Sequence, residues 1–105
     1  MDSQSRVTLF TDEINNRHKS LFGDYSCFTA IVAGLGGVGS WVAIDLALMG
    51  MGTIILFDDD VIEASNLNRT LFRLNQIGKP KTESVKELIM ERRKDVIVIP
   101  MTEKL

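Results

Sequence analysis

The stretch Gly34–Ser40, which reads Gly-Leu-Gly-Gly-Val-Gly-Ser, decides the fold of this chain. Just before it, residues 28–33 read Phe-Thr-Ala-Ile-Val-Ala, an apolar and partly β-branched run with the length of one buried strand. Just after it, apolar side chains recur at helical spacing as far as Met49, which predicts a largely buried helix. A strand, a glycine-rich turn and a helix in this order form a nucleotide cradle, because glycines let the backbone approach a phosphate and the helix start offers free N–H groups.

The size and composition of the chain limit the classes of protein it can belong to. Its 105 residues make one domain at most, and a charged share of 25% is typical of a soluble globular chain. A net charge of −2 argues against a generally nucleic-acid-binding surface. The single cysteine, Cys27, excludes an internal disulfide and favours a cytoplasmic location. No signal region or membrane-spanning stretch is visible, so we expect no membrane partner.

The first part of the chain is predicted to be an arm outside the nucleotide-binding unit. Residues 1–26 are polar and mixed in charge, and Thr11-Asp12-Glu13 can open a short helix with acids in its first turn. We therefore expect a helical N-terminal arm over residues 1–26, packed on another surface such as a second subunit. Residues 27–105 then form a partial nucleotide-binding domain.

Three acids follow the second predicted strand, Thr53–Phe57. In a dinucleotide-type fold the carboxylate at this position meets a ribose hydroxyl, and Asp58 lies near the separation of about 20 residues from the glycine turn that such folds show. We expect Asp58 to take the ribose role ahead of Asp60, with Asp59 facing solvent. The alternative is a solvated turn.

Polar and basic side chains dominate residues 61–75. Asn66, Arg69 and Arg73 are spaced three and four residues apart, so one short helix would present them together. Arg69 is a permanently charged, fork-shaped donor that suits a polyphosphate. A solvated helix face whose arginines pair with nearby acids explains the same spacing equally well.

The last two predicted elements are a helix and a third strand. Pro80 fits the first turn of a helix, which places Lys81 at the helix entrance beside the carboxyl edge of the sheet. The third strand is predicted over Asp95–Pro100. The chain is thus α/β, the three-stranded N-terminal half of a Rossmann-like doubly wound parallel sheet in the order 3-2-1. The outer edge of the first strand would lack a partner, which indicates a piece of a longer protein.

Four motifs in this order resemble the ThiF/MoeB family, whose nucleotide-binding fold is shared with ubiquitin-activating enzymes. The motifs are Gly34–Ser40, Asp58–Asp60, Ser65–Arg69 and Gly78–Lys81. The resemblance runs from about Arg17 to the third strand and implies that ATP, rather than NAD, occupies the cradle. It further implies that a carboxylate, usually the C-terminal glycine of a ubiquitin-like or sulfur-carrier protein, is joined to the α-phosphate with release of pyrophosphate.

The resemblance also implies a set of site residues. The cofactor-binding set combines turn glycines, two acids and three phosphate ligands, namely Gly34, Gly36, Gly37, Gly39, Asp58, Asp60, Asn66, Arg69 and Lys81. Arg69 and Lys81 are also implied as catalytic residues, together with Arg17, which in the family reaches across a dimer into the neighbour's ATP site. The alternative for Arg17 is a surface arginine. The family's ligand for Mg²⁺ is an aspartate expected beyond residue 105.

Three other interpretations remain open at this point. Gly37–Trp41 and Ser20–Gly23 are also similar to the branch of the family that dehydrates threonylcarbamoyl-adenosine, whose partner is tRNA. An NAD-dependent oxidoreductase uses the same cradle, although hydride transfer needs no set of polyphosphate ligands. A non-catalytic subunit of a heterodimeric activating enzyme would keep the fold without the reaction.

The side chain of Cys27 is expected to pack against its neighbours rather than to form a thioester.

Overall fold

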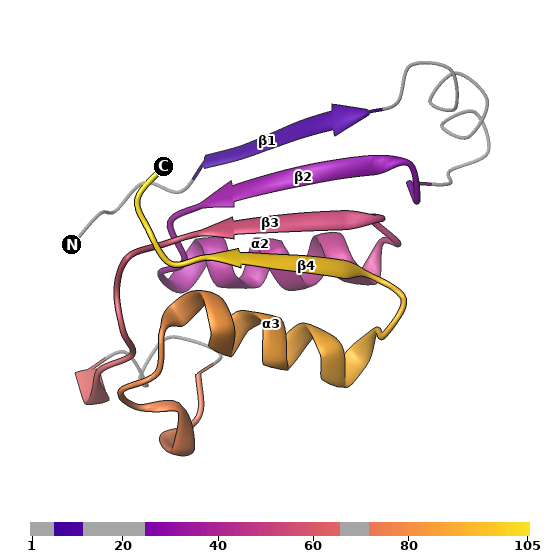
Figure 1. Cartoon of the computed structure of the whole chain (residues 1–105). Coiled ribbons are helices and arrows are strands. Elements are labelled where there is room, and N and C mark those ends of the chain that lie inside the picture. The colour runs from indigo at the N-terminus through magenta and orange to yellow at the C-terminus, as the bar shows by residue number, and fades with distance from the viewer. Residues whose placement is uncertain (1–5, 12–24, 66–71) are drawn as a thin grey trace.

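A computed structural model describes residues 6–11, 25–65 and 72–105 of the chain (Figure 1). In chain order, the named elements are β1 (Arg6–Thr11), β2 (Phe28–Ala33), α2 (Gly37–Leu48), β3 (Thr53–Phe57), the 3₁₀ helix η3 (Leu74–Gln76), α3 (Lys81–Arg92) and β4 (Ile97–Met101). The four strands form one sheet in the order β1-β2-β3-β4.

The three parallel strands confirm the predicted Rossmann-like half sheet. β2 pairs with β3 and β3 with β4, so that Ile31, Ile55 and Ile99 are aligned across the sheet. β2 and β3 occupy the residues that their apolar runs predicted. β4 begins at Ile97, two residues later than the predicted Asp95, because Asp95 lies in the preceding turn and its carboxylate accepts hydrogen bonds from Arg93.

The prediction of a helical arm is wrong for residues 6–11, which form a strand antiparallel to β2. The pairing runs from Arg6 opposite Ala33 to Thr11 opposite Phe28. This segment consists mostly of β-branched and apolar residues, which favour a strand, and the open edge of β2 offers it a row of backbone hydrogen-bonding groups. The edge that was expected to lack a partner is therefore paired. The predicted helix start at residues 12 and 13 lies outside the described residues.

Helices α2 and α3 cover the same face of the sheet (Figure 1). This arrangement follows from right-handed crossovers that proceed across the sheet in one direction. The strand residues that face the helices are buried, and they are Ala30, Val32, Ile54, Leu56 and Val98. On the opposite face, which no helix among the described residues covers, Ile97 is 60% exposed and Ile99 is 40% exposed. The core therefore lies between the sheet and the α2–α3 layer.

The turn between α2 and β3 is closely packed against the residues that precede β2. A Cβ atom on Gly52 would lie 1.9 Å from the carbonyl oxygen of Ser26, so only glycine fits there without a backbone shift.

Among the described residues, neither helix has the length and apolar character needed to cross a lipid bilayer.

Candidate nucleotide-binding site

The glycine turn leaves β2 with a backbone conformation that favours glycine. Gly34 has a φ of 90°, in the left-handed region, and its N–H donates a 2.9 Å hydrogen bond to the carbonyl oxygen of Phe57 at the end of β3. The space above the turn is open at Gly36, because a Cβ atom added there would meet nothing within 4 Å. Gly39 is buried in the first turn of α2.

The start of α2 presents uncapped backbone donors. No side chain caps the helix and no acid lies in its first turn. The Ser40 hydroxyl instead donates to the carbonyl oxygen of Gly36 at 2.8 Å. Because the first N–H groups of a helix have no partner within the helix and lie at the positive end of its dipole, this end of α2 suits an anionic group.

Asp58 ties the glycine turn to the end of β3. Its Oδ2 accepts a 2.7 Å hydrogen bond from the N–H of Leu35, and its Oδ1 accepts a 2.8 Å hydrogen bond from the N–H of Asp60. Only 9% of the residue is exposed. Each carboxylate oxygen can accept more than one hydrogen bond, so acceptor capacity remains for a ligand. The structure thus brings Asp58 beside the glycine turn, while its ribose role stays a prediction.

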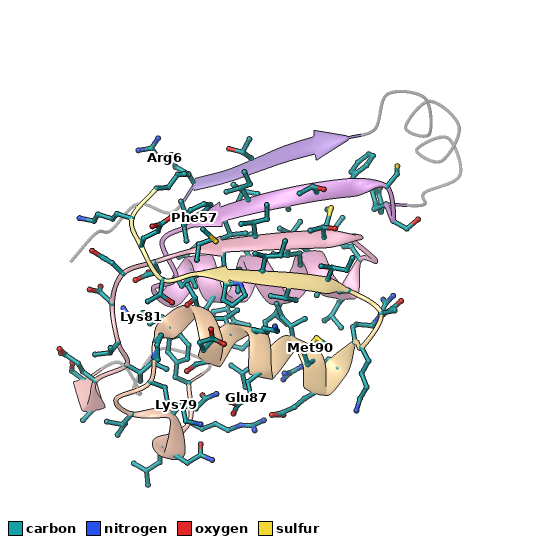
Figure 2. All side chains as sticks on the ribbon, in the orientation of Figure 1. Arg6, Phe57, Lys79, Lys81, Glu87 and Met90 are labelled. Atoms are coloured by element: carbon teal, nitrogen blue, oxygen red, sulfur yellow. The ribbon has the colours of Figure 1, made fainter. Side chains whose placement is uncertain are left out.

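Lys81 lies at the start of α3, on the side of the sheet where β2, β3 and β4 end (Figure 2). Its N–H donates a 3.0 Å hydrogen bond to the carbonyl oxygen of Asp60, and its Nζ lies 3.7 Å from Asp60 Oδ2. The Lys81 side chain is 9% exposed, whereas that of Asp60 is 62% exposed. A bridge between Val61 and Pro80 holds the two segments together. The glycine turn, the acidic run and Lys81 are therefore linked by successive contacts.

The three consecutive acids have carboxylate oxygens within 4.8 Å of one another, which raises the question of a metal ion. Asp58 already accepts two backbone hydrogen bonds, and Asp60 pairs with the ammonium group of Lys81. A cation would have to displace Lys81 and compete for the lone pairs of Asp58. This cluster does not fit a magnesium site, and we assign no step to a metal ion held by it.

Three of the predicted site residues, Arg17, Asn66 and Arg69, lie outside the described residues. Arg73, which was grouped with Asn66 and Arg69 by its spacing, pairs with Glu91 on α3 through two hydrogen bonds of 2.6 and 2.5 Å. This pairing raises the pKa of Arg73 and lowers the pKa of Glu91. The pairing of Arg73 with an acid is therefore confirmed, but the helix that was expected to carry it is wrong at this residue, because Arg73 has extended backbone just before η3.

Sequence reasoning missed Gln76, which is fully buried and anchors the loop before α3. Its Oε1 accepts a 2.9 Å hydrogen bond from the N–H of Arg73, and its Nε2 lies 3.4 Å from both the carbonyl oxygen of Ser84 and Oε1 of Glu87. The polar run around residue 75 carries no periodic signal that singles out one buried amide.

Comparison with known proteins decides the family of this chain. The model of the ThiF family matches residues 23–105. The chain belongs to the ThiF family. The resemblance predicted from its four motifs is thereby confirmed. Among its relatives, ubiquitin-like modifier-activating enzyme 5 of Arabidopsis thaliana is 37% identical over 75 residues, which cover 71% of this chain and 17% of the relative. The NEDD8-activating enzyme E1 catalytic subunit of the same plant is 44% identical over 71 residues, which cover 67% of this chain and 16% of the relative.

Solved structures of similar proteins support the same assignment of this ThiF-family chain. A crystal structure of Escherichia coli MccB with ATP is 40% identical, with a TM-score of 0.66 over 69% of this chain and 22% of that protein. The structure of PaaA is 38% identical, with a TM-score of 0.68 over 71% of this chain and 23% of that protein. The chain thus spans less than a quarter of the length of these proteins.

Proposed function

We propose that this chain carries the ATP-binding part of an enzyme that adenylates a carboxylate. One observation carries the proposal: the glycine turn, an acid and a cation meet at the carboxyl edge of the sheet. They are held there by the hydrogen bond from Leu35 to Asp58 and by the contact of Asp60 with Lys81. Ligands of open α/β sheets bind at this edge. The relatives support the proposal, since they are named as activating enzymes and MccB has been solved with ATP.

In the proposed reaction a carboxylate oxygen bonds to the α-phosphorus of ATP and pyrophosphate leaves with the electrons of the broken bond. Charge on the phosphate oxygens would be stabilised by the start of α2 and by Lys81, assisted by Asn66 and Arg69. No general base is needed, because the attacking carboxylate is already ionised at neutral pH. The protein therefore acts by holding two anionic reactants in line beside fixed cationic donors.

The described residues fit ATP in three respects. The space above Gly36 leaves room for a phosphate against the backbone, and the uncapped start of α2 supplies N–H donors. Asp58 keeps acceptor capacity for the ribose hydroxyls. We propose that Gly34, Gly36, Gly37 and Gly39 shape this cradle.

We propose that the acceptor is the C-terminal glycine of a ubiquitin-like or sulfur-carrier protein. The names of the relatives support this class, since they refer to ubiquitin-like modifiers and to NEDD8. The further parts of the proposal are a Mg²⁺ ligand beyond residue 105, a homodimer in which Arg17 reaches the neighbouring site, and a cytoplasmic location. A tRNA nucleoside as acceptor is the competing outcome.

ATP–pyrophosphate exchange by the full-length protein tests this proposal. We expect exchange that depends on an acceptor protein ending in glycine and that falls strongly in the Arg69→Ala variant. Titrations of ATP with magnesium and of NAD, followed by the fluorescence of Trp41, the single tryptophan of the chain, separate the adenylating enzyme from an oxidoreductase. Binding of NAD without binding of ATP would overturn the proposal, and ATP binding without exchange would identify a non-catalytic subunit.

A further inference from the structure

We propose that Asp60 is a positioning residue that orients the ammonium group of Lys81 toward the polyphosphate of ATP. This inference rests on the proposed function and assigns Asp60 an indirect role in it. The acid would act through Lys81 rather than by touching the ribose.

The backbone of Asp60 is held on both sides by other predicted site residues. Its N–H donates to Oδ1 of Asp58 at 2.8 Å, and its carbonyl oxygen accepts from the N–H of Lys81 at 3.0 Å. Asp60 is therefore the link between the acid at the end of β3 and the first residue of α3. Its place in the molecule is set by the same contacts that build the site.

The side chains of Asp60 and Lys81 also meet, at a distance that orients the ammonium group without occupying its donors. The Nζ–Oδ2 distance of 3.7 Å is longer than a charge-assisted hydrogen bond of about 2.7–2.9 Å. Lys81 is thus attracted to Asp60 while its three N–H donors remain able to reach phosphate oxygens. A lysine stem has four rotatable carbons, so a neighbouring charge that limits its motion lowers the entropy lost when a ligand binds.

The side chains of Lys81 and Asp60 differ in their exposure to water. The stem of Lys81 is packed away from water, whereas most of the Asp60 side chain is in water. The ion pair therefore lies where the buried stem of Lys81 reaches the surface. An exposed ion pair is weak. A phosphate can therefore replace Asp60 as the partner of the ammonium group, or bind that group together with Asp60, at little cost in free energy.

Asp59 provides a matched control within the same acidic run. It is exposed and its carboxylate lies within 4.8 Å of the Asp60 carboxylate, but the ion pair with Lys81 is formed by Asp60. The Asp59→Asn variant removes one negative charge beside the site, as Asp60→Asn does, but leaves the Lys81 contact intact. It therefore separates a positioning effect from a general change in the local potential.

Equilibrium titrations of the full-length protein with ATP and with adenosine test the inference. They compare the wild type with Asp59→Asn, Asp60→Asn, Asp60→Glu, Lys81→Met and the Asp60→Asn/Lys81→Met double variant. We expect Asp60→Asn to raise the Kd for ATP by about three- to tenfold, the effect of one oriented charge contact. The Kd for adenosine should stay unchanged, and Asp60→Glu should retain most of the ATP affinity. In the Lys81→Met background, Asp60→Asn should have no further effect. Circular dichroism on each variant confirms that it is folded.

Each other outcome overturns the inference. An equal loss of adenosine and ATP affinity would show that Asp60 contacts the ribose directly. Unchanged or tighter ATP binding in Asp60→Asn would show that the acid competes with the phosphate for Lys81. If the full-length wild-type protein binds neither ligand, the proposed function fails as well, whereas ATP binding with additive effects in the double variant overturns only the role of Asp60.

Discussion

The N–H of Leu35 in the glycine turn donates a 2.7 Å hydrogen bond to the carboxylate of Asp58 at the end of β3. This bond joins two segments 23 residues apart in the sequence and is buried. It fixes the carboxylate beside the glycine turn. The acid that the sequence singles out for a ligand therefore also has a structural role.

Removing the Asp58 carboxylate should cost both stability and nucleotide affinity. In Asp58→Ala the N–H groups of Leu35 and Asp60 lose their acceptor, and we expect the free energy of unfolding to fall by about 2–4 kcal/mol. Urea denaturation measures this change. Asp59→Ala, which truncates the exposed neighbour, should alter stability by less than about 0.5 kcal/mol. Equal stability of the two variants would show that the hydrogen bonds accepted by Asp58 contribute nothing.

Gly52 should tolerate no side chain. In Gly52→Ala the new Cβ atom would lie 1.9 Å from the carbonyl oxygen of Ser26 and 2.8 Å from its carbonyl carbon, so the backbone must move. We expect a loss of about 1–3 kcal/mol or more, as for other overpacked sites, visible as a lower melting temperature. A variant with the wild-type melting temperature would contradict the close contact with Ser26.

Gly36 should behave in the opposite way. Its φ of −69° is open to other residues, and an added Cβ atom meets nothing within 4 Å, so Gly36→Ala should remain folded and about as stable as the wild type. We expect the Kd for ATP to rise by about tenfold, which corresponds to about 1.4 kcal/mol, because the methyl group occupies the space proposed for a phosphate. Isothermal titration measures the affinity. Wild-type affinity in this variant would place the phosphates elsewhere.

The Arg73–Glu91 pair should make a pH-dependent contribution to stability. The hydrogen bonds from Arg73 lower the pKa of Glu91 below its ordinary value of 4.5, so the stabilisation is present above that value and is lost as the pH falls through the lowered pKa. The difference in stability between the wild type and Glu91→Gln should therefore shrink as the pH falls below about 4.5. Because both side chains are partly exposed, it should also shrink in high salt.

Glu103→Gln serves as a charge-matched control for this measurement, since Glu103 is exposed and, among the described residues, its N–H rather than its carboxylate forms a hydrogen bond. Its difference from the wild type should change less with pH than that of Glu91→Gln. Identical pH profiles for the two variants would rule out the contribution of the Arg73–Glu91 pair.

Several parts of the fold were predictable because their signals are local. The apolar runs at Phe28–Ala33 and Thr53–Phe57 predicted two strands at their observed bounds, and the glycine turn predicted the helix that follows. Burial of a continuous apolar segment and the freedom of glycine are properties of neighbouring residues. The acids after the second strand and Lys81 after Pro80 could be placed at one sheet edge by topology alone.

By itself, the sequence determined the family, the order of the parallel strands and the edge of the sheet at which the candidate site lies. Only the tertiary structure decided that residues 6–11 form β1, that Asp58 bonds to Leu35, and that Asp60 meets Lys81. The physical reason is that these contacts depend on which backbone edges and charges are left without partners after the strands and helices have packed. That choice is made by the whole fold, whereas apolar periodicity and turn chemistry are encoded in short stretches of chain.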